Sequence, residues 1–541
     1  MTSSSARVAA ATIPESPTPA AGAMESRARD SEARSERPAR GPALLAALAA
    51  FGITALVLPA APGIGDSAEL TLALALGGIP HPTGYPFWVM AGHLFVRAAH
   101  ALGATWVVAA NLWSAVGAAV AVGAFTRLAQ HLDVALADAD RAASRAPLRP
   151  LARRTAIALP AAALALNPVW LDAATIAEVY SWSAAWIAVA MAFTLSRLRG
   201  LGGVEPAADD ARAAAVWGAI AGLCAVHHAL GMPFVLTCSA ALIAAQVRAG
   251  RWRASLAVAA VGGALVPLAS YAWIPWRAAH PAAYQWPSGS SAMALWLHAT
   301  GAAYTRYMGG FAPSAEQWEL MRAGLLPWIL PGLGLGSIAA LRTATPLRWG
   351  LLALLGGAVL TVGFVVSYSV PDPAMYLLAA LMASLAMATP GLRGLARRAG
   401  PERALALGVA IVVALAAWSV PRALAERARL ATADANNRAW WSSIPFDRGI
   451  VLWADDHYPV FKALQLLEGL RPALYVENPT FLIWPARRSE FQRRFGFDPL
   501  EGLALRSSDD ITRISENIRR RASVPVIVLP TGEVVTAAGS R

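Results

Sequence analysis

Long apolar segments, separated by short polar connections, follow one another through most of this chain of 541 residues. A helix that crosses a bilayer needs about 20 mostly apolar residues. Because lipid offers no hydrogen bonds to an open backbone, such segments are driven to form spanning helices. We therefore expect an all-α membrane bundle of about eleven spans. The expected spans are 42–60, 105–128, 155–171, 182–198, 213–230, 231–247, 254–275, 324–341, 349–369, 373–390 and 404–420.

The composition supports lipid as the main solvent of the chain. Hydrophobic residues make up 57% and charged residues 14%, whereas soluble domains carry about 25% charged residues. The net charge of +12 does not indicate nucleic-acid binding, because Lys462 is the only lysine and the arginines stand at the edges of apolar segments. That placement is typical of membrane topology.

The arginines also predict the orientation. Residues 1–40 are polar, carry five arginines after position 26 and lack an apolar run, so we expect a disordered cytoplasmic tail. With the N-terminus cytoplasmic, the arginine-rich connections fall on the cytoplasmic side, and the short outer connections near 172–181, 226–233 and 370–373 carry no arginine. This pattern predicts an integral protein of a bacterial-type inner membrane.

Two parts of the chain are expected outside the spans on the non-cytoplasmic side. Residues 86–101 are apolar but contain His93, Arg97 and His100, which favours a helix at the membrane interface rather than a twelfth span. The transmembrane domain, residues 41–420, would thus carry outer juxtamembrane helices in 61–104 and a long outer loop, 277–323.

Residues 421–541 have an ordinary soluble composition and predict a small α/β domain outside the cytoplasm. Gly449–Trp453, 473–476 and 524–529 are rich in β-branched and aromatic residues, as strands are. Residues 458–470 and 508–521 separate them and have the pattern of helices.

Carboxylates and an imidazole gather in the first outer segment. Asp66 and Glu69 are three residues apart, so a helix starting there would place both on one face. Three prolines and a glycine then hold an extended stretch that presents His81 and Tyr85. An N-terminal cap with a solvated acid and ordinary structural punctuation explain these residues equally well from spacing alone.

Other polar groups on the same predicted side lie in later outer connections. Glu178 stands at a membrane boundary beside Tyr180, and a carboxylate there is costly unless it is paired or used. His228 lies at the next outer turn. The loop 277–323 carries its own arginines and tyrosines, which suit either a lipid phosphate or interfacial anchoring. These loop residues are Arg277, Tyr304 and Arg306, and Asp372 adds a further acid near position 370.

The stretch Gly-Asp-Ser-Ala-Glu-Leu at 65–70, followed by Gly-Ile-Pro-His-Pro-Thr-Gly-Tyr-Pro at 78–86, resembles the opening of a known membrane family. This is the protein O-mannosyltransferase-like family, formerly a domain of unknown function, of the GT-C glycosyltransferase superfamily. The resemblance continues through Ala-Glu-Val-Tyr at 177–180 and His-His at 227–228 to the residues around 277, 304 and 372. Thr83 and Trp276 depart from the commoner residues of the family.

The resemblance implies an inverting transfer of a sugar, a mannose-like hexose, from a polyprenyl-phosphate donor to an acceptor hydroxyl outside the cytoplasm. The acceptor would be a protein Ser/Thr or a glycan. By the same resemblance Asp66 is the general base. The remaining residues would bind substrate: Glu69, His81, Tyr85, Glu178, Tyr180, His228, Arg277, Tyr304, Arg306 and Asp372. Arg277 is the first choice for the leaving phosphate and Arg306 the second.

No cofactor is expected to be required and no metal ligand is assigned, although carboxylates in two outer loops leave room for a divalent cation. A transporter or flippase of lipid-linked glycans is the alternative function. Such proteins place ionisable residues within their spans, whereas here the acids gather at one side.

Overall fold

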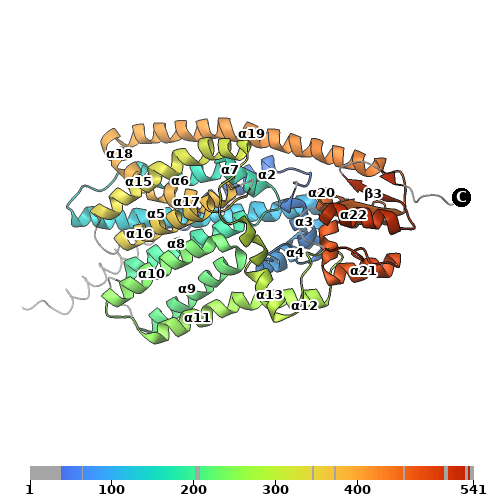
Figure 1. Ribbon diagram of the computed structural model, residues 1–541. Coiled ribbons are helices and arrows are strands. Elements are labelled where there is room, and N and C mark those ends of the chain that lie inside the picture. Colours follow the sequence, from blue (N-terminus) through green and yellow to red (C-terminus); the bar gives the residue numbers. More distant parts are fainter. Residues whose placement is uncertain are drawn as a thin grey trace, which may run out of the picture. The chain divides into compact units, whose positions relative to one another are not determined.

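The computed structural model describes residues 38–63, 65–201, 207–343, 347–370, 373–454, 457–504, 510–529 and 534–535. Nearly all of the tail expected over residues 1–40 lies outside these ranges. Residues 40–541 form one compact unit, which is helical up to residue 443 and contains a sheet after it (Figure 1).

The helical part is built from long helices joined by short connections (Figure 1). Its helices are α2 (Gly41–Val57), α3 (Asp66–Leu76), α4 (Pro86–Ala101), α5 (Trp106–Ala142), α6 (Pro150–Ala165), α7 (Pro168–Thr175), α8 (Tyr180–Gly200), α9 (Ala207–His227), η1 (Ala229–Gly231), α10 (Met232–Arg248), α11 (Ala254–Leu268), η2 (Ala269–Ala272), α12 (Trp273–Ala279), α13 (Ala292–Ala299), η3 (Ala302–Tyr307), α14 (Ala315–Leu320), η4 (Met321–Leu325), α15 (Leu326–Arg342), α16 (Leu347–Val366), η5 (Met375–Leu377), α17 (Leu378–Met387), α18 (Thr389–Ala399) and α19 (Pro401–Ser443).

Each of the eleven expected ranges contains helix, and the apolar helices make the chain an integral membrane protein. By length and composition, seven helical stretches of the described chain qualify as spans. An eighth is added if α6 and α7, bent by 58° at their junction, count as one. Helix α2 has only 17 residues, and α8 and α9 are less apolar, so the count of eleven stays a prediction.

Helices α3 and α4 are not among the candidate spans, in keeping with the expected interface helix at 86–101. Helix α3 is buried along residues 67–75, because α4 and α5 pack on it from the bundle and α20 (His457–Leu467) packs on it from the C-terminal part. Helix α3 therefore lies between the bundle and the sheet-containing part of the chain.

Helix α19 continues past the expected domain boundary at residue 420 and ends only at Ser443. Pro421 lies inside it. In Figure 1 this long helix follows the bundle and reaches the strands, and it contacts both α6 and α20. The change from an apolar to an ordinary composition after residue 420 therefore falls inside a continuous helix and does not mark the end of that helix.

The C-terminal α/β region, residues 444–535, contains the strands and helices expected from its sequence. Its sheet has the order β2-β1-β3-β4, in which β1 pairs in parallel with β2 and β3, and β4 is antiparallel to β3. Helix α21 and strand β4 were not expected. The elements are β1 (Gly449–Trp453), α20, β2 (Leu474–Glu477), η6 (Pro479–Ile483), α21 (Pro485–Phe495), α22 (Asp510–Arg521), β3 (Val526–Leu529) and β4 (Val534–Val535).

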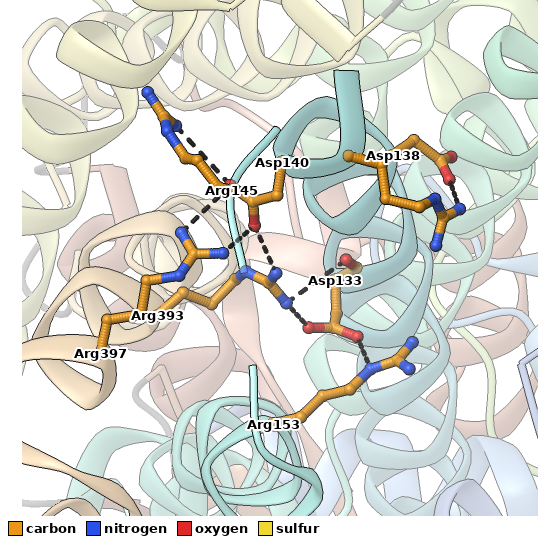
Figure 2. A network of polar contacts seen from close by, with 8 residues as sticks. Asp133, Asp138, Asp140, Arg145, Arg153, Arg393 and Arg397 are labelled. Carbon is orange, nitrogen blue, oxygen red and sulfur yellow. Dashed lines mark hydrogen bonds and ion pairs between the residues drawn. The ribbon is translucent and has the colours of Figure 1, made fainter. Parts of the chain in front are cut away.

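A network of ion pairs joins α5 to α6 and α18 (Figure 2). Asp133 on α5 is fully buried and pairs with Arg153 of α6 and with Arg393 of α18. Asp140, two turns further on, pairs with Arg393 at 2.8 Å and with Arg397. The side chain of Arg393 is only 4% exposed, so both charges of its pair with Asp133 are removed from solvent. Several arginines that the topology rule treats as loop charges are therefore held by acids of α5.

Candidate functional site

The first turn of α3 carries the two carboxylates expected there. Asp66 is the first residue of the helix and Glu69 lies one turn later. The side chain of Asp66 is 61% exposed, whereas that of Glu69 is 5% exposed. A helix N-terminus stabilises a nearby negative charge, so this turn presents one accessible and one buried carboxylate on the same face.

The proline-rich loop after α3 folds back onto this turn. The backbone N–H of His81 donates a hydrogen bond of 2.6 Å to Oε1 of Glu69. The ring Nδ1 of His81 lies 3.4 Å from Oε1 of Glu69 and 3.8 Å from Oδ1 of Asp66. On its other side, Nε2 lies 3.1 Å from the hydroxyl of Tyr85. The structure thus brings together four of the residues expected to form the site.

Gly84 allows the loop to take this path. Its φ is +84°, and a Cβ there would lie 2.8 Å from Cδ1 of Ile274 and 2.9 Å from Nε2 of His298. Any other residue would meet both the strained backbone and this close packing. The short spacing between His81 and Tyr85 therefore depends on a glycine between them.

The charge of His81 is determined by its neighbours. Burial by itself would lower the pKa of this imidazole, but the carboxylates of Asp66 and Glu69, with a smaller contribution from Glu178, raise the pKa to about 10. His81 is therefore an imidazolium at neutral pH, and it balances part of the negative charge at the start of α3.

This raised pKa predicts a pH-dependent contribution to stability. Because the folded-state pKa lies above the ordinary value of 6.5, the stabilisation is fully present below about pH 6.5 and is lost as the pH rises through about 10. It amounts to on the order of 5 kcal/mol at its maximum. Thermal unfolding of wild type and His81→Gln in detergent should differ strongly at pH 6.5 and converge near pH 10.

The matched control is His280→Gln, which replaces an exposed histidine whose ring contacts Trp276. It should change the unfolding temperature little at either pH. A difference between wild type and His81→Gln that stays constant from pH 6.5 to 10 would show that the carboxylates do not hold the proton on His81.

A group of aromatic rings continues from Tyr85 into the bundle. The ring of Tyr85 stacks on His228 with centroids 5.9 Å apart, and Tyr180 lies 5.6 Å from the same histidine. Tyr376 contacts both Tyr180 and His228. The expected pocket residues of three separate segments therefore form one aromatic surface, to which Tyr376 is an addition.

Glu178 is buried between α7 and α8, on the same side of the bundle as Asp66. Its backbone N–H donates to the hydroxyl of Ser114 at 3.0 Å, and that hydroxyl donates to its carbonyl oxygen at 3.1 Å. Its charge also makes a small contribution to the raised pKa of His81. Asp372, the last acid of the expected set, lies outside the described residues.

The two arginines expected near the phosphate have different surroundings. The guanidinium of Arg277 donates to the carbonyl oxygens of Gly77 at 2.6 Å and Leu76 at 3.1 Å, so it caps the C-terminal end of α3. Arg306 instead lines a cavity with Asp66; its guanidinium lies 4.9 Å from the ring centroid of Tyr307. This placement favours Arg306, the second choice, over Arg277.

The cavity in front of Asp66 has a volume of about 740 Å³, within the usual range for ligand sites. Asp66, Glu69, His81, Tyr304 and Arg306 line it. Gly65 and Pro82 of the two motifs line it as well, and the remaining lining residues come from the loop 277–323 and from the C-terminal α/β region. They include Tyr284, Trp286, Ser288, His298, Tyr458, Asn478, Thr480, Phe481 and Trp484.

Asp66, Glu69 and His81 also have the donor atoms of a cation site, all within 4.8 Å of one another. Carboxylate oxygens with one imidazole nitrogen suit a divalent metal ion. However, an imidazole must be neutral to ligate a metal, and His81 holds its proton up to a pKa of about 10. A cation would therefore have to displace that proton.

Fold and site together define a polytopic membrane protein with an acid–histidine centre in a cavity outside its spanning helices. Residues 66–251 match the protein O-mannosyl-transferase TMEM260 N-terminal domain. This match, over about a third of the chain, confirms the resemblance seen in its motifs. The chain is accordingly a membrane glycosyltransferase-like protein. Among curated proteins, none matches the chain.

Solved structures similar to the chain include two membrane enzymes. The oligosaccharyltransferase AglB from Archaeoglobus fulgidus, in complex with an inhibitory peptide and a dolichol-phosphate, is 11% identical, with 92% of this chain and 74% of that chain covered and a TM-score of 0.48. ArnT from Cupriavidus metallidurans, bound to undecaprenyl phosphate, is 15% identical, with 81% and 90% covered and a TM-score of 0.47.

Proposed function

We propose that this protein transfers a mannose-like hexose from a polyprenyl-phosphate donor to the hydroxyl of an acceptor, a protein Ser/Thr, outside the cytoplasm. The observation that carries the proposal is the cavity in which the accessible carboxylate of Asp66 and the guanidinium of Arg306 share one lining. Residues 66–251 match a family named for a protein O-mannosyl-transferase. This match supports the choice of reaction.

The reaction follows from these two groups. Asp66 accepts the proton of the acceptor hydroxyl, and the oxygen attacks the anomeric carbon of the sugar. The bond between that carbon and the phosphate oxygen breaks, and the polyprenyl phosphate leaves with the electron pair. A single displacement of this kind inverts the anomeric configuration, as in GT-C enzymes of the inverting type.

Charge determines the roles of the other residues. Arg306 stabilises the negative charge that develops on the departing phosphate. The imidazolium of His81 pairs with the buried Glu69, and Asp66 is the carboxylate that is exposed and lines the cavity. Tyr304 lines the cavity on the side of the sugar, and the rings of Tyr85, Tyr180 and His228 form a packed aromatic group next to His81. The polyprenyl tail lies along apolar helix surfaces in the bilayer.

The same arrangement supports transfer without a metal, because His81 and Arg306 already supply positive charge to the cavity. A divalent cation held by Asp66, Glu69 and His81 would supply equivalent charge in place of the imidazole proton. Activity retained after treatment with EDTA would favour the metal-free reaction, and activity restored only by added Mn²⁺ or Mg²⁺ would contradict it.

The function is tested in proteoliposomes that contain the purified chain, radiolabelled polyprenyl-phosphate mannose and an extract of envelope proteins. Time-dependent transfer of label to protein, with inversion at the anomeric carbon, is the expected result. If the label remains on the lipid with every acceptor offered, the chain is not this transferase. Transport of unreacted donor across the vesicle bilayer would instead indicate the flippase alternative.

The role of Arg306 is tested by comparing Arg306→Gln with Arg277→Gln. Charge-assisted hydrogen bonds contribute about 1.5–3 kcal/mol, so Arg306→Gln should raise the KM for the lipid donor by about one to two orders of magnitude. Arg277→Gln removes the cap of α3 and should lower the unfolding temperature while the donor KM stays near the wild-type value. If Arg277→Gln raises the donor KM and Arg306→Gln does not, Arg277 is the residue that binds the phosphate.

A further inference from the structure

The C-terminal α/β region forms one wall of the cavity that contains Asp66. Ala454 follows β1 and Asn478 follows β2, and both line the cavity. Strand β1 pairs in parallel with β2, so the carboxyl ends of both strands lie at the same edge of the sheet. Ligands of open α/β sheets bind outside the carboxyl ends of the strands. The edge of the sheet that commonly binds ligands therefore faces the reacting carboxylate.

This wall is held rigidly against the helix that carries Asp66. Leu72 of α3 and Tyr284 of the outer loop share a hydrophobic core with Tyr458 of α20 and Phe481 of η6. The side chain of Arg487 donates to the carbonyl oxygen of Gln285 at 3.1 Å. The distance between Asp66 and the C-terminal wall is thus determined by packing on both sides of the cavity.

A buried carboxylate orders the strand end itself. Glu477 is fully buried and accepts hydrogen bonds from the hydroxyls of Tyr458 at 2.9 Å and Tyr475 at 3.2 Å. It also accepts the backbone N–H of Asn478 at 3.1 Å. Asn478 in turn accepts the backbone N–H and the hydroxyl of Thr480. The polar groups that face the cavity are therefore preorganised.

The two walls of the cavity differ in charge. The charged groups that line it, Asp66, Glu69, His81 and Arg306, all come from outside the C-terminal α/β region. The described lining residues of that region carry no charge. They are Ala454, Tyr458, Pro459, Asn478, Thr480, Phe481 and Trp484. The side chain of Trp484 is exposed, at 44%, and offers a flat apolar surface beside the amide of Asn478.

Two hydroxyls between the walls lack hydrogen-bond partners in the described chain. Tyr284 is 1% exposed and Ser288 follows it in the same extended stretch; the hydroxyl of each is buried and unsatisfied. A buried polar group without a partner costs free energy. Both residues line the cavity, so a ligand with its own donors and acceptors would satisfy them.

We propose that the C-terminal α/β region binds the acceptor as an uncharged polypeptide segment, laid between the 284–288 stretch and Asn478, Thr480 and Trp484, with its Ser or Thr hydroxyl toward Asp66. Neutral amide and hydroxyl groups along both sides match the alternating N–H and C=O groups of an extended backbone. The charged wall is left for the sugar and its phosphate. This inference rests on the proposed sugar transfer.

The test uses full-length protein in proteoliposomes with radiolabelled polyprenyl-phosphate mannose and two acceptors, envelope proteins and the glycan fraction left after protease digestion. Trp484→Ala is compared with Ile483→Ala, which alters the adjacent residue, 48% exposed and outside the cavity lining. Truncating a central aromatic contact should raise the KM for the protein acceptor about tenfold or more. The donor KM should not change, and Ile483→Ala should behave as wild type.

Ser288→Ala should also raise the acceptor KM, by less, without lowering the unfolding temperature, because its hydroxyl has no partner within the described chain. Normal transfer to protein by both Trp484→Ala and Ser288→Ala would contradict acceptor binding by the C-terminal α/β region. The proposed sugar transfer would still stand. Transfer to the glycan fraction alone would show that the acceptor is a glycan and not a polypeptide. A wild-type protein that consumes no donor would instead contradict the transferase itself.

Discussion

Asp66→Asn should lower the rate of sugar transfer by about two to four orders of magnitude, the usual contribution of a general base. The amide cannot accept the proton of the acceptor hydroxyl, yet it has nearly the same shape. Asp66 is 61% exposed, but its charge helps to hold the proton on His81, so its replacement should lower the unfolding temperature, by less than His81→Gln does. Transfer is measured in proteoliposomes and unfolding in detergent.

Glu316→Gln is the matched control for this variant. Glu316 is also an exposed carboxylate in the first turn of a helix, α14, but it does not line the cavity. Its replacement should leave transfer unchanged. Near-normal transfer by Asp66→Asn would exclude Asp66 as the base, and Glu69 is then the remaining carboxylate of the same turn.

Asp133→Asn should destabilise the protein by up to about 3–5 kcal/mol, the usual cost of removing one partner of a buried ion pair. Arg393, whose side chain is 4% exposed, would keep only Asp140, which it shares with Arg397 (Figure 2). Arg153 loses the same partner. Thermal unfolding in detergent should show a clearly lower midpoint, while the transfer rate per folded molecule should be kept.

Asp138→Asn provides the comparison on the same helix. Asp138 pairs with Arg141 and Arg199, but its side chain is 41% exposed, and ion pairs accessible to solvent contribute about 0–1 kcal/mol. Equal destabilisation by the two variants would show that burial does not determine the strength of this network. Asp133 lies 19 residues after Ser114 on α5, about 28 Å along the helix axis, which is why transfer should be unaffected.

Local properties of the chain could be predicted from the sequence. The long apolar stretches became helices because spanning a bilayer requires internal hydrogen bonding, and that requirement is met within each segment. Asp66 and Glu69 share one helix face because their spacing is close to one turn. The strands at Gly449–Trp453 and its neighbours follow from composition and length, which are also local.

Placements that depend on distant partners were not accessible in the same way. Arg277 and Arg306 stand in one outer loop with similar neighbours, but carbonyl groups of α3, some 200 residues earlier in the chain, engage only Arg277. The arginines of the basic connections were interpreted only as markers of the cytoplasmic side. In the structure several of them form ion pairs with acids of α5 (Figure 2). Neither the contacts of Arg277 nor these ion pairs correspond to a regular residue spacing, so they could not be predicted from the sequence.

The sequence by itself determined that this is a membrane protein, that the segment after its first apolar helix carries a pair of acids with a histidine, and that strands alternate with helices near its C-terminal end. Only the tertiary structure decided that the sheet of that fold closes the cavity over Asp66 and that Arg306 completes its charged wall. The physical reason is the distance along the chain over which each interaction acts. Hydrophobic periodicity and helix geometry act over a few residues, whereas a cavity is formed by side chains that packing brings together from more than 400 residues apart.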